Sequence, residues 1–187
     1  MTRPLRIGIL ALQGAVQPHR AKLARLGAEP VLVRDARELE TCAGLILPGG
    51  ESTTMLHLIH AYALWQPLLD FAAARPLWGV CAGSILMAAR VEHPSQESLA
   101  VVPITVRRNA YGRQVDSFEA EVDWKGIGLV RAIFIRAPRI ERIGAGVEVV
   151  AEHGSEPVAV RSGAVTLTAF HPELTDDHRI HRAFVRG

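Results

Sequence analysis

The chain has 187 residues and a formal net charge of +2, with 49% apolar and 21% charged residues. This length fits one domain that buries roughly 70% of its unfolded surface, and the small charge does not predict nucleic-acid binding. No apolar run approaches the ~20 residues of a membrane span. The two cysteines, Cys42 and Cys81, make no disulfide framework, so we expect a protein of the reducing cytoplasm.

The first half of the chain alternates predicted strands and helices. Short apolar runs predict strands at residues 5–12, 30–34, 43–50 and 76–80. Helical spacing predicts helices at residues 17–26, 54–62 and 65–74. Strands and helices that alternate through short connections are typical of a parallel sheet with helices on both faces.

The second half is richer in strands. Short runs bounded by turn residues predict strands at 100–108, 117–124, 131–138, 147–153, 157–163 and 164–170, and a helix follows at 176–185. No linker or internal repeat separates the halves, so we predict one domain over residues 1–187. The expected fold is α/β with three layers: a mainly parallel central sheet, helices on both faces, and added antiparallel strands.

The stretch Gly79-Val80-Cys81-Ala82-Gly83 has the spacing of a nucleophile elbow between a strand and a helix. The two glycines allow the strand and the helix to approach, and the helix N-terminus stabilises a thiolate. The amide of Ala82 would then face a developing oxyanion. Cys81 alone is equally compatible with a small apolar core residue.

A base for this thiol is offered by His171, which follows the apolar run at residues 164–170. On an extended chain Glu173 faces the same way as His171, so its carboxylate can orient the ring. The sequence therefore predicts a nucleophile, base and orienter in the order Cys81, His171, Glu173.

The turn in "LILPGGESTTM", residues 45–55, follows a predicted strand and opens a helix. It is either a plain turn with a helix cap or, at the carboxyl edge of the sheet, part of a ligand site. If the elbow at Cys81 is real, Gly49 and Gly50 supply the natural second oxyanion donor.

The remaining seven histidines share no catalytic motif: His19, His57, His60, His93, His153, His178 and His181. Two pairs of them, at 57/60 and 178/181, have helical spacing, but no third ligand with suitable spacing predicts a metal site. We expect surface or capping roles for these pairs and loop or helix-end positions for the others. Cys42 is expected to be a buried apolar residue.

Together, the segments "GILALQG", "LPGGESTT", "GVCAGSIL", "RRNAYGRQVDSFEA", "FIRAP" and "FHPELTDDHRIH" resemble the class I, triad-type glutamine amidotransferases, which have a flavodoxin-like fold. Within them the chain is similar to the branch of glutaminase subunits that serve pyridoxal 5′-phosphate synthases. Ile85 stands where many relatives of other synthases carry Gln, and the block at residues 109–120 is typical of this branch. Val80 departs from the Thr that the branch often has, at a position that does not react.

The resemblance implies roles for particular residues. Cys81 would attack the side-chain amide of L-glutamine, His171 would move protons, and Glu173 would hold His171. The implied substrate-binding residues, which include the oxyanion donors, are Gly49, Gly50, Glu51, Ser52, Ala82, Arg108, Ile135 and Arg136. For the two arginines, surface ion pairing is the alternative.

The resemblance also implies a partner and a location. Ammonia would pass to a (β/α)₈-barrel pyridoxal 5′-phosphate synthase subunit in a large hetero-oligomer in the cytoplasm, with no metal, organic cofactor, nucleic acid or membrane involved. Docking would complete the oxyanion hole, so activity alone would be low. The alternatives are a glutaminase for another synthase, such as that of histidine biosynthesis, a peptidase-like hydrolase, and a regulatory module with an inactive site.

Overall fold

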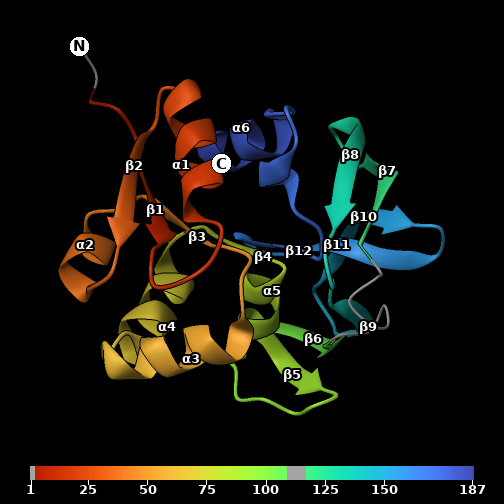
Figure 1. Ribbon diagram of the computed structural model, residues 1–187, viewed down its shortest axis with the longest axis horizontal. Helices are drawn as coiled ribbons and strands as arrows, with labels where there is room; N and C mark the ends of the chain where they lie inside the picture. The colour runs from red at the N-terminus through yellow and green to blue at the C-terminus, as the bar shows by residue number, and fades with distance from the viewer. Residues whose placement is uncertain (1–2, 109–116) are drawn as a thin grey trace.

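A nine-stranded mixed sheet crosses the molecule in the order β2-β1-β3-β4-β12-β11-β10-β7-β8 (Figure 1). The computed structural model describes residues 3–108 and 117–187. Residues 109–116 of the block predicted at 109–120 therefore lie outside the described residues.

The parallel part of this sheet contains β2, β1, β3, β4 and β12. These strands are Glu29–Val33, Arg6–Leu10, Gly44–Leu47, Leu77–Val80 and Val165–Thr168. Every residue of β3 and β4 is buried, because helices cover both faces of the sheet. The five parallel strands have the order of flavodoxin-like folds. In these folds ligands bind beyond the carboxyl ends of the strands, at the switch point where the strand order reverses. Here that point lies between β1 and β3.

Helices form the two outer layers. On one face lie α1 (Val16–Arg25) and α6 (Arg179–Arg186). The other face is covered by α2 (Ala36–Glu40), α3 (Ser52–Ala61), α4 (Trp65–Ala74) and α5 (Ala82–Met87). The predicted three-layer arrangement is therefore confirmed. The short helix α2 was not predicted, because five residues are too few to show a helical period.

Antiparallel strands extend the sheet on one side only. They are β11 (Glu156–Ser162), β10 (Glu148–His153), β7 (Phe118–Trp124) and β8 (Gly128–Phe134). A separate three-stranded sheet contains β5 (Ala88–Glu92), β6 (Val102–Arg107) and β9 (Arg139–Ile143). The predictions missed β5 and β9, since charged residues interrupt both and leave few buried side chains to mark a strand.

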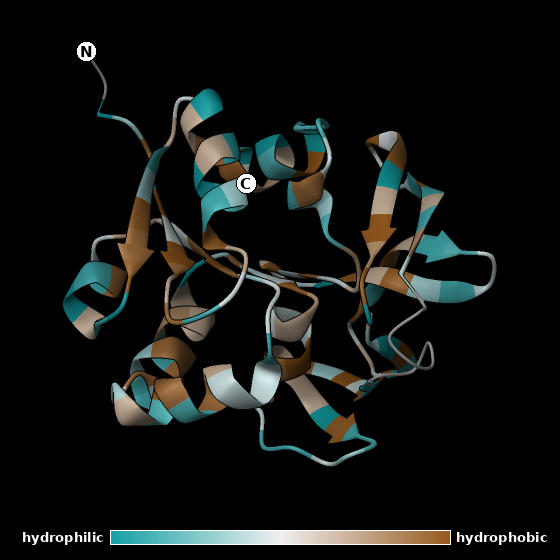
Figure 2. Ribbon diagram, viewed as in Figure 1, coloured by the Kyte–Doolittle hydropathy of each residue, from teal (hydrophilic) through white to brown (hydrophobic). Residues whose placement is uncertain are grey.

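Two apolar clusters, one on each side of the parallel strands, form the core. Figure 2 shows the hydrophobic residues concentrated on the central strands and the inner faces of the helices. Cys42 is 2% exposed, so its predicted place in the core is confirmed. Among residues 3–108 and 117–187, no helix is long and apolar enough to cross a membrane.

Candidate active site

A cavity of about 490 Å³ lies beyond the carboxyl ends of the parallel strands. Its walls come from the segments that follow β1, β3, β4, β6, β8 and β12. Cys81, His171 and the turn at Gly49 all line it. A larger hollow of about 720 Å³ lies beside α6, and its described lining residues include no cysteine or histidine. The smaller cavity is therefore the candidate active site.

Cys81 sits in a strained turn directly after β4. Its φ is 50° and its ψ is −101°, a backbone conformation that residues other than glycine rarely adopt. The Cys81 amide donates to the carbonyl of Thr168 at 2.8 Å, which ties the turn to β12. Ser84, a residue to which the sequence assigned no role, also stabilises the turn, because its Oγ lies 2.9 Å from the carbonyl of Gly79. This geometry is the predicted nucleophile elbow.

The glycines of the elbow are required by packing. A Cβ on Gly79 would lie 2.9 Å from backbone atoms of Gly83, and a Cβ on Gly83 would overlap the carbonyl of Leu47. The strand and the helix can therefore approach only because neither position has a side chain. Ala82 begins α5, so its N–H belongs to the first turn and has no intrahelical acceptor.

His171 and Glu173 form a buried pair beside the elbow. Nδ1 of His171 lies 2.7 Å from Oε1 of Glu173, and the ring lines the same cavity as Cys81. The predicted pairing is confirmed, but the expected extended backbone is wrong. Pro172–Leu174 forms a turn of 3₁₀ helix, η1, because Pro172 fixes φ at a value that suits the start of a helix.

The electrostatics of this pair favour its charged form. Burial lowers the pKa of the His171 ring, but hydrogen bonds with Cys81 and Glu173, and the charges of both, raise that pKa to about 10. Burial raises the pKa of Glu173, but the hydrogen bond with His171 and the nearby imidazoles of His19 and His171 lower it overall. A protonated imidazole is therefore held between Glu173 and Cys81.

The turn at Gly49 and Gly50 lies against the histidine. A Cβ on Gly49 would come within 2.9 Å of Nδ1 of His171 and 3.5 Å of Cβ of Cys81, so only glycine fits. The carbonyl of Gly49 accepts a hydrogen bond from the amide of Ala15 at 2.8 Å. Because the peptide is trans, the N–H of Gly50 points away from Ala15.

The start of α3 carries two of the predicted binding residues, Glu51 and Ser52, and a third, Arg108, contacts Glu51. The Glu51 carboxylate caps the helix by accepting from the amides of Thr53 at 3.1 Å and Thr54 at 2.7 Å. Ser52 is buried and its hydroxyl donates to Gln96 Oε1 at 3.0 Å. Arg108 lines the cavity, and its guanidinium donates to the Glu51 carboxylate at 3.3 Å. Arg108 therefore forms an ion pair and also lies in the site.

Ile135 and Arg136 form the opposite wall. The carbonyl of Ile135 lies 4.0 Å from Sγ of Cys81, and Arg136 has a φ of 43°. Arg136 and Cys81 are thus both strained residues on one cavity, and such strain tends to cluster at functional sites. All of the residues predicted for the site, apart from the buried orienter Glu173, line this one cavity.

Further lining residues were not predicted as site residues. They are Gln13, Gly14, Ala15, Ile85 and Leu174. Oε1 of Gln13 accepts from the amide of Glu51 at 2.9 Å and so joins the loop after β1 to the loop after β3. The rule that ligands bind at the carboxyl ends of parallel strands, applied to the strand ending at Leu10, points to this loop.

His19 lies near the start of α1, as its predicted helix-end position implies, but its side chain is 0% exposed. The surface or capping role expected for His181 is wrong, because this side chain is also 0% exposed. His60 fits its surface role, since it pairs with Glu97 at 2.9 Å. Within the described ranges, no three His, Cys, Asp or Glu side chains are grouped to hold a metal.

A family model and curated relatives place the chain in the same family. The model of the SNO glutamine amidotransferase family matches residues 9–187. The pyridoxal 5′-phosphate synthase subunit PdxT of Acidothermus cellulolyticus is 54% identical, over 96% of this chain and 92% of that protein. The PdxT subunit of Kosmotoga olearia is 47% identical, over 97% of each chain.

Solved structures agree with this result. A crystal structure of a glutamine amidotransferase matches with a TM-score of 0.90 at 43% identity, over 96% of this chain and 97% of the other. PurLQS from Thermotoga maritima matches with a TM-score of 0.76 at 14% identity, over 99% of each chain, which shows a shared fold.

Proposed function

We propose, from the premise that the chain belongs to the SNO glutamine amidotransferase family, that Cys81, His171 and Glu173 are its catalytic triad. As a member of this family the chain is a glutaminase: it converts L-glutamine and water into L-glutamate and ammonia. The observation that carries the assignment of the triad is the 2.7 Å contact of Glu173 with a His171 ring that lines the same cavity as the strained Cys81.

The first half of the reaction forms a thioester. The Cys81 thiolate attacks the side-chain amide carbon of glutamine, and the carbonyl electrons move to the oxygen. As the intermediate collapses, the carbon–nitrogen bond breaks and His171 gives its proton to the leaving ammonia. Glu173 keeps the ring oriented and stabilises its charged form.

The second half hydrolyses the thioester. Neutral His171 takes a proton from water, the resulting hydroxide attacks the thioester carbon, and the bond to Cys81 breaks to release glutamate. The thiolate and the protonated ring are then restored, so protons balance over the cycle. In both halves an oxyanion forms, and the amides of Ala82 and Gly50 are its proposed donors.

The substrate is held by the remaining wall of the cavity. Glu51 and Ser52 at the start of α3 and Arg108 beside them bind glutamine in this proposal, and Ile135 and Arg136 contact its α-amino-acid end from the opposite wall. Their support is that all five line the cavity that contains Cys81.

The ammonia serves the synthesis of pyridoxal 5′-phosphate. Relatives at 54% and 47% identity are named as subunits of pyridoxal 5′-phosphate synthase, and this supports the same destination here. In our proposal the chain acts as one glutaminase domain in the cytoplasm. It docks on a (β/α)₈-barrel synthase subunit in a large hetero-oligomer, which activates it. A glutaminase for another synthase is disfavoured, because both of these relatives are named for pyridoxal 5′-phosphate synthase.

The experiment measures glutamate and ammonia release by the chain mixed with a pyridoxal 5′-phosphate synthase subunit. We expect Cys81→Ala to abolish release, because the thioester cannot form, and Cys42→Ala to retain it. The second variant is a matched control, since Cys42 is a buried cysteine outside the cavity. Full turnover by Cys81→Ala would contradict the assignment of the triad.

A further inference from the structure

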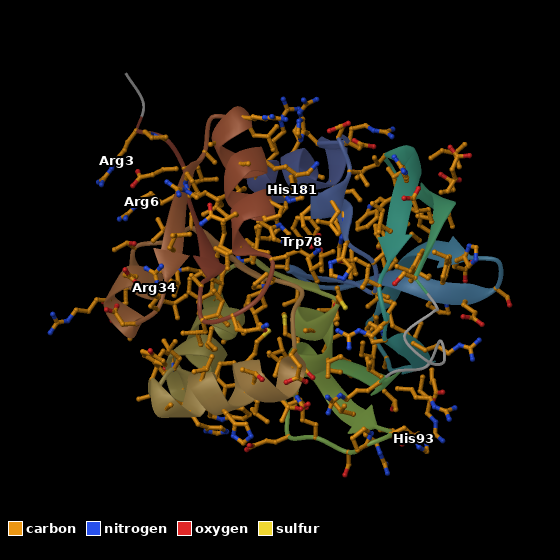
Figure 3. All side chains as sticks on the ribbon, in the orientation of Figure 1. Arg3, Arg6, Arg34, Trp78, His93 and His181 are labelled. Atoms are coloured by element: carbon orange, nitrogen blue, oxygen red, sulfur yellow. The ribbon has the colours of Figure 1, made fainter. Side chains whose placement is uncertain are left out.

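Two buried histidines lie behind the triad, on the side of the sheet covered by α1 and α6. His19 belongs to α1 and His181 to α6, and their ring nitrogens, Nδ1 and Nε2 respectively, are 2.9 Å apart. Figure 3 labels His181 and Trp78 close together in this layer. The Trp78 indole makes T-shaped contacts with both rings, with centroids 5.8 Å from His19 and 4.7 Å from His181. All three side chains are fully buried, so the rings pack closely together.

This pair reaches the triad through Glu173. Oε1 of Glu173 forms a hydrogen bond with His171, while Oε2 of the same carboxylate lies 3.8 Å from Nε2 of His19. Both of these facing atoms are buried and lack any hydrogen-bond partner among the described residues. A buried carboxylate oxygen without a donor is costly, and catalytic hydrogen bonds are often long before substrate binds. A closure of about 1 Å would bring the two atoms to hydrogen-bonding distance.

The tautomers of the two rings follow from this geometry. If His19 carries its proton on Nε2, it donates to Glu173, and its bare Nδ1 accepts from Nε2–H of His181. Nδ1 of His181, which has no partner among the described residues, is then a bare nitrogen and leaves no donor unpaired. The opposite assignment would point a lone pair of His19 at the carboxylate and bury an unpaired N–H on His181.

We propose that His19 is a positioning residue for the glutaminase reaction: as the neutral Nε2–H tautomer, fixed by His181, it donates to Glu173 and thereby holds the carboxylate that orients His171. The proposal rests on the proposed triad. It extends the chain of contacts from Cys81 through His171 and Glu173 to two residues that do not line the cavity.

Burial, more than the charges around it, keeps His19 neutral. Burial lowers its pKa most, to about 4, and the Glu173 carboxylate opposes this. His171 on the triad side and Lys22 on α1 lower that pKa further. Burial likewise lowers the pKa of His181 well below its usual value, and positive charge on His19, Lys22 or His178 would lower it further. A neutral imidazole donates from only one nitrogen, so the tautomer of His19 decides whether it donates to Glu173 or to His181.

The test compares two substitutions at His19 in the chain assembled with its synthase. His19→Gln retains an N–H donor near the position of Nε2, whereas His19→Leu fills the space without one. We expect the Leu variant to lose roughly tenfold in kcat with little change in KM, since the lost hydrogen bond acts on a buried charge. The Gln variant is expected to recover most of that loss. His57→Gln, on the exposed side of α3, is the control.

Two further readouts separate positioning from mere packing. A looser Glu173 supports a protonated His171 less well, so the alkaline limb of the kcat/KM profile should move to lower pH in His19→Leu but not in His19→Gln. Nitrogen-15 NMR of the wild-type chain should show His19 as the Nε2–H tautomer, a measurement that needs no variant to fold.

Equal kcat in His19→Gln and His19→Leu, or an Nδ1–H tautomer of His19, would overturn the proposal. Either result would leave the triad intact. Failure of the triad itself would instead appear as full turnover by Cys81→Ala.

Discussion

Acid stability of the protein should be governed in large part by His19. In the unfolded chain this imidazole titrates near its ordinary pKa of 6.5, whereas burial, against the opposing charge of Glu173, lowers its pKa to about 4 in the native state. Between these two pH values the unfolded chain binds more protons than the native protein does. The free energy of unfolding must therefore fall as the pH falls through this window.

The size of this effect follows from the displacement of the pKa. Each unit corresponds to about 1.4 kcal/mol, so a change from 6.5 to about 4 removes about 3 kcal/mol of stability by the bottom of the window. This is a large share of the roughly 5–15 kcal/mol by which native domains are stable. His181, whose pKa is also lowered by burial, adds to the loss in the same direction.

The assay is urea unfolding at a series of pH values from about 7 to about 4, for the wild type and His19→Gln. Gln does not titrate, so the variant should lose less stability over this range, whatever its stability at neutral pH. The exposed His57→Gln should follow the wild type. If the wild type and His19→Gln lost stability in parallel, the reasoning from burial would be refuted.

Further predictions concern the packing and charge of the site. Gly49→Ala would place a Cβ within 2.9 Å of Nδ1 of His171, so we expect kcat to fall by roughly tenfold to a hundredfold in glutaminase assays; wild-type turnover would show that the ring has room to move. Gly83→Ala would press α5 against the Leu47 carbonyl, and we expect unfolding in urea to show a loss of about 1–3 kcal/mol. The pKa of His171 is raised from 6.5 to about 10, so its contribution to stability is present below 6.5 and is lost as the pH rises through about 10. Glu173→Gln removes one of the groups that raise this pKa, so alkaline denaturation should depend less on pH in this variant; an unchanged dependence would argue against the pairing.

Much of the site could be predicted from sequence because its parts are local. The elbow needs two glycines around Cys81 between a buried strand and a helix, and that context is visible in a short stretch. His171 and Glu173 are two residues apart, so their pairing is visible too. The position of the parallel strands places both stretches at one edge of the sheet.

The buried histidines could not be predicted, because their environment is built from distant parts of the chain. His19 and His181 are 162 positions apart, and only the packing of α1 against α6 brings their rings together. Each lies among charged residues on its own helix, a pattern that favours solvent exposure when it is considered alone. The strands β5 and β9 were missed for a related reason: they pair within a small separate sheet, where burial is partial and alternation weak.

The most direct test of the central claim is capture of the thioester. The chain, assembled with its synthase and supplied with glutamine, is quenched in acid during turnover, digested, and examined by mass spectrometry. The account predicts a γ-glutamyl group on the peptide that contains Cys81, none on the peptide that contains Cys42, and none at all in Cys81→Ala. Steady glutamate release without any γ-glutamyl adduct on Cys81, or with the adduct on another residue, would contradict it.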